Sequence, residues 1–308
     1  MRWDHPRVQI IVHRNTEHGE KEKVMTDGRT YAREISRKTP LCVILLIDQS
    51  LSMSEEWGDE RTTKADKVPQ IVNKLLNETI SRATKGNEIW DYYYYSLIGY
   101  GPDSHAAPAF TGALAGKWEA STSDLHANGE HVPVSVLVEG ESYQVMEKSW
   151  LSPVADGNTP MAEAFEIAEK IVKEWIDRRP DTFPPIVINV TDGKWTTTDP
   201  APVVERIKKL STIDGECLVF NVHISAERGE DKLVFPCQED LRDEDEFDYA
   251  RSLFQMSSEL PPTMVQAARA RGMKVEIGAR AFCFNVDNSA ELLEVLEIGS
   301  RPNTLSKE

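Results

Sequence analysis

The chain is 308 residues long, 40% hydrophobic and 28% charged, a composition that excludes a chain disordered throughout its length. Thirty-five basic residues oppose 51 acidic ones, which gives a net charge of −16. Charge of this sign repels phosphate backbones and anionic lipid surfaces, so we expect no nucleic-acid partner and no membrane partner.

The chain shows no apolar run of about 18 residues and no apolar signal core near its first residue. The four cysteines are widely spaced and form no CxxC pair, and Cys42, Cys217 and Cys283 lie in apolar runs. Buried free thiols are the ordinary interpretation of that pattern. Together these features predict a cytoplasmic protein.

Three parts are expected along the chain. Residues 1–39 are polar and charged, with one apolar run at 8–12 that would form an edge strand or an arm. Residues 40–298 carry the predicted domain, with an insertion at about 102–150. Residues 299–308 are expected to form a C-terminal tail.

Strands are predicted over 41–48, 91–101, 184–193, 215–225 and 280–287, and the apolar runs at 41–48, 184–193 and 215–225 are expected to be buried. Apolar residues at helical spacing predict helices over 64–83, 200–210, 249–258 and 262–271, one starting at Thr159-Pro160, and one after Ser289. We expect a loop over 102–130, and a hairpin or a short edge strand over 132–147. Strands alternating with helices indicate an α/β, Rossmann-like three-layer fold, with a mostly parallel central sheet and helices on both faces.

Oxygen-bearing side chains lie at one end of three of these predicted elements. Asp48, Ser50 and Ser52 follow the apolar run of the first strand, Thr159 opens a helix, and Asp192 follows the apolar run of the strand over 184–193. In open α/β sheets ligands bind beyond the carboxyl ends of the strands, so these side chains are expected to converge. An oxygen-only set suits hard divalent cations, and we expect Mg²⁺ or Mn²⁺, with Ca²⁺ less favoured.

This pattern resembles the metal-ion-dependent adhesion site of the von Willebrand factor A (vWA) family. The matching residues are D-x-S-x-S at 48–52, then Thr159, then T-D-G at 191–193. The resemblance implies that Ser50 and Ser52 coordinate the ion directly, that Thr159 binds directly or through water, and that Asp48 and Asp192 often act through water. It also implies a binding module rather than an enzyme, in which an Asp or Glu of a partner protein completes the metal shell.

The missing signal core and disulfides make the chain more similar to stand-alone bacterial cytosolic vWA proteins of the tellurite-resistance-like group. That resemblance implies a stress-response or defence system. The partner would then be a kinase, a phosphatase or another protein from the same gene cluster.

Two other interpretations stay open. One is a phosphatase similar to the haloacid dehalogenases with Asp48 as nucleophile, although such enzymes need a second aspartate where Ser50 stands. The other is a scaffold with a purely structural metal site. Trp57 and Trp195 are each either a partner-binding anchor near the ion or a packed indole, and His223 is expected in the core.

Overall fold

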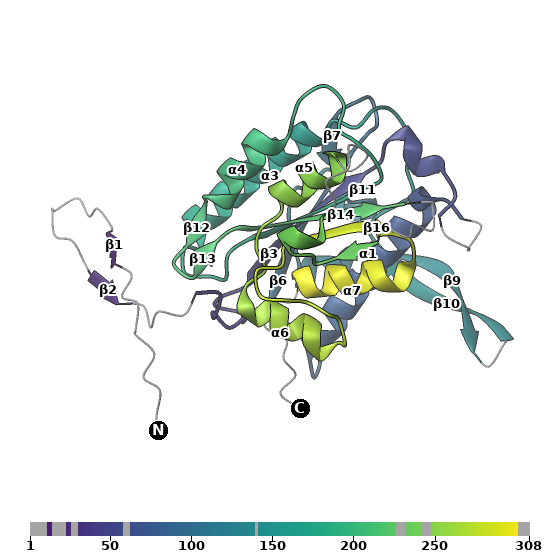
Figure 1. Ribbon diagram of the computed structural model, residues 1–308. Coiled ribbons are helices and arrows are strands. Elements are labelled where there is room, and N and C mark those ends of the chain that lie inside the picture. Colours follow the sequence, from purple (N-terminus) through teal and green to yellow (C-terminus); the bar gives the residue numbers. More distant parts are fainter. Residues whose placement is uncertain are drawn as a thin grey trace.

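The computed structural model describes residues 11–13, 23–25, 30–57, 62–138, 141–225, 232–241 and 248–300. Its centre is an eight-stranded sheet (Figure 1) with the order β15-β16-β14-β11-β3-β6-β7, in which β8 also pairs with β6. Five strands are parallel: β3 (Leu41–Asp48), β6 (Tyr93–Tyr100), β11 (Ile186–Thr191), β14 (Leu218–Ile224) and β16 (Phe282–Val286). The predicted mostly parallel sheet is therefore confirmed.

The central strand β3 shows why its sequence forms a buried parallel strand. All eight of its residues are buried. Leu45 and Ile47 pack into the hydrophobic core on one side of the sheet, while Ile44 and Leu46 pack into the core on the other side. A strand covered on both faces needs a continuous apolar run instead of an alternating one.

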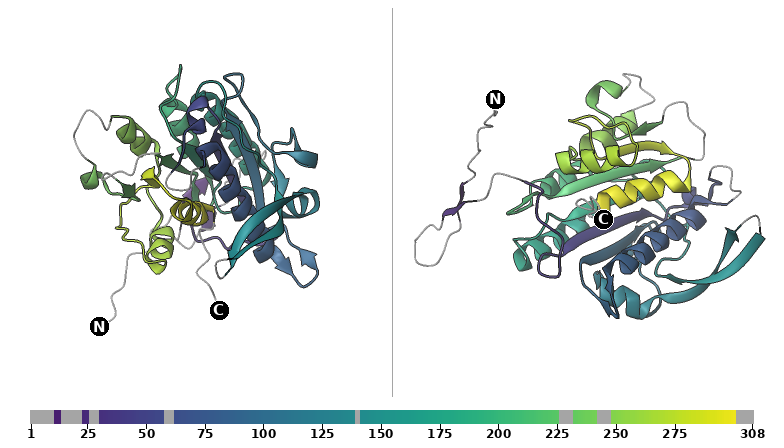
Figure 2. Two further views of the ribbon diagram at one scale, coloured as in Figure 1. Left: turned by 90° about the vertical axis from the view of Figure 1, so that its right-hand side faces the viewer. Right: turned by 90° about the horizontal axis from the view of Figure 1, so that it is seen from below.

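Helices cover both faces of the sheet (Figures 1 and 2). The core on one face is built with α1 (Lys64–Ala83), α6 (Pro262–Ala270) and α7 (Ser289–Ser300). The core on the other face is built with α3 (Met161–Arg178), α4 (Ala201–Lys208) and α5 (Asp248–Met256). The molecule thus has the three layers that alternating strands and helices predict.

The expected loop over 102–130 is wrong, because the segment holds short regular elements. These are β7 (Ala106–Pro108), η2 (Gly112–Leu114), β8 (Ala120–Ser121) and α2 (Thr122–Asn128). Both strands pair antiparallel with β6, and a capping box of Ser121 and Asp124 starts the helix. Elements this short in a Gly-, Pro- and Ala-rich segment lack the apolar periodicity on which such predictions depend.

The predicted hairpin is confirmed as β9 (Glu130–Val138) and β10 (Glu141–Ser149), which project from the body of the molecule (Figure 1). Side chains at its base hold it to α1: Asn73 donates to the Leu151 carbonyl at 2.9 Å, and Asn77 donates to the Lys148 carbonyl at 2.7 Å. The remaining short elements are β4 (Thr84–Lys85), β5 (Glu88–Ile89), β12 (Ser211–Thr212), β13 (Gly215–Glu216), β15 (Leu233–Val234) and η3 (Gln238–Asp240).

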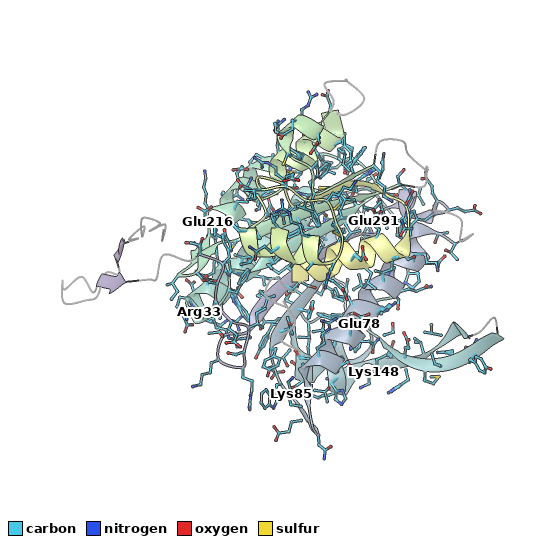
Figure 3. The ribbon with its side chains drawn as sticks, turned by 60° about the horizontal axis from the view of Figure 1, so that its bottom comes forward. Arg33, Glu78, Lys85, Lys148, Glu216 and Glu291 are labelled. Carbon is cyan, nitrogen blue, oxygen red and sulfur yellow. The ribbon has the colours of Figure 1, made fainter. Side chains whose placement is uncertain are left out.

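The two described strands of the N-terminal extension do not join the edge of the central sheet. These strands, β1 (Ile11–His13) and β2 (Lys23–Met25), pair with each other. Further along, the backbone amide of Arg33 donates to Asp214 Oδ2 at 3.0 Å, and Figure 3 shows Arg33 and Glu216 at the same end of the molecule. Residues 8–10 of the apolar run and residues 301–308 lie outside the described part, and α7 includes residues 299 and 300 of the expected tail.

All four cysteines are buried and unpaired, as expected for Cys42, Cys217 and Cys283. Within the described ranges, no helix combines the length and the apolar character that a membrane crossing needs.

An ion-pair cluster joins α3 to α4 and gives a test of the fold. Arg206 Nη2 lies 2.7 Å from Glu169 Oε2, and Lys173 Nζ lies 2.7 Å from Glu169 Oε1. The hydrogen bond from Arg206 is the main cause that lowers the pKa of Glu169 to about 2. A carboxylate with a lowered pKa stabilises the fold above its unfolded pKa, and this stabilisation is lost as the pH falls towards the folded value.

We expect Glu169→Gln to lower the melting temperature at pH 7 by about 2–4 °C. The difference from wild type should shrink as the pH falls from 5 towards 3, because the unfolded carboxyl then binds its proton. Thermal melts at a series of pH values measure this. Glu174→Gln, at an exposed position of the same helix, is the control, and a pH-independent difference at position 169 would contradict the assignment.

Candidate metal centre

The candidate site lies where the strand order reverses. From β3 the chain passes through α1 to β6 on one side, and it later returns as β11 on the other side of β3. Loops that leave neighbouring parallel strands in opposite directions open a crevice at their carboxyl ends. Asp48 is the last residue of β3 and Asp192 directly follows β11. The fold therefore places both predicted acids at this crevice.

Four of the five predicted residues form one continuous chain of contacts. The Ser50 amide donates to Asp48 Oδ1 at 2.9 Å, and the Ser50 and Ser52 hydroxyl oxygens lie 3.1 Å apart. The Ser52 hydroxyl donates to Asp192 Oδ1 at 2.7 Å, across 140 residues of sequence. The short 3₁₀ helix η1 (Leu51–Ser54), which begins inside the D-x-S-x-S motif, turns Ser52 back towards Asp192.

Thr191, the last residue of β11, contacts Asp48 on the neighbouring strand. Its hydroxyl donates to Asp48 Oδ2 at 2.7 Å. The parallel register pairs Val190 with Ile47, so Thr191 and Asp48 come next on neighbouring strands. Both oxygens of Asp48 thus accept hydrogen bonds from the protein, and these bonds fix the orientation of the carboxylate at the end of β3.

Thr159 lies beside the cluster without joining its hydrogen bonds. In the described part of the chain, no hydrogen bond links its side chain to the other four residues. Its backbone is held by Thr196, whose hydroxyl accepts from the Thr159 amide at 3.1 Å and whose amide donates to the Thr159 carbonyl at 3.0 Å. The N-cap of α3 is Pro160, so the helix begins at Met161 and not at Thr159-Pro160 as expected.

Two glycines let the loop before α3 approach the D-x-S-x-S turn. A Cβ on Gly101 would lie 2.4 Å from the Gln49 carbonyl oxygen, and a Cβ on Gly157 would lie 2.0 Å from the Gly101 carbonyl oxygen. Gly157 also has a positive φ of 71°. The Leu51 amide donates to the Gly157 carbonyl at 3.2 Å. Only residues without a side chain permit this approach, which brings Thr159 to the same edge as the serines.

The buried carboxylates create an electrostatic problem. Asp48 is 1% exposed. Burial, followed by the negative charge of Asp192, raises the pKa of Asp48 to about 6, although hydrogen bonds from Ser50 and Thr191 oppose the shift. A nearby positive charge would relieve this penalty.

Lys64 supplies a positive charge beside Asp192, and this residue was not predicted from the sequence. Its Nζ lies 2.8 Å from Asp192 Oδ2 and 2.8 Å from Glu55 Oε2, and its side chain is 4% exposed. Lys64 is the first residue of α1, whose start is fixed by a capping box of Thr63 and Asp66. The capping sequence was a readable signal for the helix start, but nothing local indicates the partner Asp192.

The structure also places the two tryptophans and the histidine considered from the sequence. Trp57 is a packed indole: it is buried, and its Nε1 donates to the Val286 carbonyl at 3.1 Å. Trp195 is only partly buried and lies 5.8 Å from the ring of Tyr249, whose hydroxyl donates to the Gly193 carbonyl. His223 is a core residue as expected, and burial lowers its pKa to about 4.

The donor set fits a small divalent cation. Adjacent ligands of an octahedral Mg²⁺ with bonds of about 2.0–2.1 Å are about 2.9 Å apart. The separations of 3.1 Å between the two serine hydroxyls and 2.7 Å between Ser52 and Asp192 are hydrogen-bond lengths that are also compatible with this spacing. Among the described residues, no group of three or more His, Cys, Asp or Glu forms a metal site. A cation here would therefore depend on hydroxyl oxygens as well as carboxylates.

Comparisons with known proteins add the following. No family model and no curated protein matches the chain. Similar solved structures include the pilus adhesin SpaC from Lactobacillus rhamnosus GG, with 14% identity and a TM-score of 0.42 over 84% of this chain and 30% of that one. They also include the ArnB paralog VWA2 from Sulfolobus acidocaldarius, with 12% identity and a TM-score of 0.35 over 83% of this chain and 44% of that one.

This chain thus spans less than half the length of either structure. Identities and TM-scores this low carry no information about the function of the site, which has to be inferred from its own residues. Those residues define a Rossmann-like α/β protein with a cluster of carboxylates and hydroxyls at the carboxyl edge of its sheet.

The raised pKa of Asp48 predicts how stability depends on pH in metal-free protein. The fold disfavours the ionised carboxyl, so the penalty is absent below the unfolded pKa of 3.8 and grows until the pH passes about 6. We expect Asp48→Asn to gain stability relative to wild type between pH 4 and pH 7, by about 3 kcal/mol at most.

Urea unfolding at pH 4, 5.5 and 7 in the presence of a chelator measures this difference. Asp177→Asn, at an exposed position on α3, is the control and should show a constant offset. A constant offset for Asp48→Asn as well would contradict the raised pKa.

Proposed function

We propose that this protein is a binding module, not an enzyme, in which a divalent cation links the carboxyl edge of the sheet to a carboxylate of a partner protein. Asp48, Ser50, Ser52, Thr159 and Asp192 would hold Mg²⁺ or Mn²⁺. The observation that carries the proposal is the chain of contacts from Asp48 through Ser50 and Ser52 to Asp192.

The cation, when bound, supplies a Lewis-acidic position for an anionic ligand. Ser50 and Ser52 offer neutral oxygens, so they do not exhaust its positive charge. Asp48 accepts hydrogen bonds from the Ser50 amide and from Thr191, which leaves it oriented and able to act through water. Asp192 is fixed from two sides, by Ser52 and by Lys64.

The surroundings of the site favour a macromolecular ligand. Leu51, between the two serines, is 63% exposed although it is a large apolar residue. Ser52 is partly exposed, while Ser50 and Asp48 are buried. A ligand would therefore approach past Ser52 and Leu51. An exposed apolar side chain beside the position proposed for the partner's carboxylate suits a protein interface.

The alternatives weighed from the sequence are less well supported. A phosphatase mechanism on Asp48 needs an acid two residues later, and Ser50 occupies that place with its amide bound to Asp48. A purely structural metal site does not explain the exposed Leu51 beside the serines. Membership of a bacterial stress-response or defence system, with a kinase or phosphatase partner, stays a prediction from the resemblance.

Cation binding should stabilise the native protein, because the ion binds only the folded arrangement. We expect Mn²⁺ at ten times its dissociation constant to add about 1.4 kcal/mol to the free energy of unfolding. Ser52→Ala should remove most of this gain, since the variant loses a proposed ligand. Thermal melts of wild type and variant across a series of Mn²⁺ concentrations measure the effect.

Ser54→Ala is the matched control. Ser54 lies in the same turn, but its hydroxyl donates to the Leu51 carbonyl instead of the cluster. Melting curves of wild type unchanged by millimolar Mn²⁺ and Mg²⁺ would refute the proposed cation site. Hydrolysis of p-nitrophenyl phosphate that needs Asp48 and Mg²⁺ would refute the assignment as a non-enzymatic module.

The open coordination position makes a second prediction. Acetate should displace water from protein-bound Mn²⁺ and lower the water-proton relaxation rate, because a carboxylate is the proposed ligand. Acetamide has a similar size and no charge, and it should have little effect. Equal responses to both molecules, with Mn²⁺ still bound, would show that the site does not select a carboxylate.

A further inference from the structure

Lys64 stands where two physical preferences oppose a lysine. It is the first residue of α1, and the positive end of a helix dipole disfavours cations there. Its side chain is also 4% exposed, and a buried ammonium is costly unless it is paired. The pairing with Asp192, whose side chain is fully buried, accounts for this placement.

The ammonium changes the charge that a metal ion would meet. Asp48 and Asp192 together would neutralise a divalent cation, but Lys64 already compensates Asp192 at 2.8 Å. An ion bound by Ser52 and Asp192 would lie close to a like charge. The buried side chains of Lys64 and Asp192 limit the solvent screening of this repulsion. Affinity for hard divalent cations depends on the charge of the ligand set.

Glu55 modulates this effect from the solvent side. Its carboxylate accepts a second hydrogen bond from Lys64 Nζ at 2.8 Å, and its side chain is 62% exposed. Glu55 directly follows η1, which carries Ser52. The turn that supplies a proposed metal ligand is therefore also tied to the lysine.

We propose that Lys64 is a resident counter-cation that weakens divalent-ion binding. The loaded site then keeps positive charge for an anionic ligand, because the solvent-exposed Glu55 offsets the charge of Lys64 only in part. This inference rests on the proposed function and specifies its regulation. Lys64 holds Asp192 in place while no metal is bound. Binding of the metal and binding of the partner's carboxylate then favour each other. The metal adds positive charge to the site, and the carboxylate of the partner compensates it.

Mn²⁺ titration of the full chain by calorimetry at pH 7 tests the proposal. Lys64→Met keeps an unbranched side chain, one heavy atom shorter, and removes its charge, so we expect Mn²⁺ to bind about tenfold more tightly than in wild type. Lys74→Met removes a charge from an exposed position on the same helix, and its affinity should stay within about twofold of wild type.

Glu55→Gln should act in the opposite direction and weaken Mn²⁺ binding by about two- to threefold, because it removes a negative charge beside the site. Its exposed side chain makes this variant safe for folding even if Lys64→Met is unstable. For Lys64→Met we also expect a lower melting temperature in chelator and a larger rise with Mn²⁺ than wild type shows.

The outcomes separate the two proposals. Tighter binding by Lys64→Met together with weaker binding by Glu55→Gln supports the counter-cation. Equal or weaker binding by Lys64→Met overturns it and makes Lys64 a residue that only positions Asp192. If neither wild type nor any of the three variants binds Mn²⁺ at millimolar concentration, the metal site itself is refuted, and the role of Lys64 falls with it.

Discussion

Two carboxylates, Asp48 and Asp192, are buried at the ends of neighbouring parallel strands, and the cost of burying both negative charges is the main electrostatic constraint on this edge of the sheet. Burial, followed by the repulsion from Asp192, raises the pKa of Asp48 to about 6. Hydroxyls of Ser52 and Thr191 and the ammonium of Lys64 surround the two acids. Apolar residues would serve stability better here, and under the proposed function the two acids are retained because they bind a cation.

The hydrophobic pattern of the sheet sets the geometry of this site. Residues of β3 alternate between the two cores, and those of β11 do the same. Because both faces are buried, a slip of one residue would exchange the two sets of side chains. The register that pairs Val190 with Ile47 is fixed in this way, and it brings the Thr191 hydroxyl to 2.7 Å from Asp48 Oδ2. Packing far from the edge therefore positions the polar groups on it.

The sequence predicts the parts of the fold that have strong local patterns. The apolar run of β3 and the periodicity of α1 indicate both elements with their observed bounds. The turns that follow β3 and β11 bring Asp48, Ser50, Ser52 and Asp192 together as expected, because parallel strands have their carboxyl ends at one edge. The short strands β7 and β8 have no such pattern and were missed. Lys64 was missed for another reason: its partner Asp192 lies 128 residues away, and only the tertiary fold joins them.

The position of Lys64 bears on why such a site would need a partner at all. Two uncompensated acids with two hydroxyls would attract a divalent cation whether or not a ligand were present. With an ammonium 2.8 Å from Asp192, part of that attraction is already satisfied. The cation then gains most when a further carboxylate arrives. Because the capping box of Thr63 and Asp66 fixes the first turn of α1, the ammonium is held in place by the same helix that packs against the core. Under the proposed function, the charge balance of the site thus makes metal binding depend on the partner.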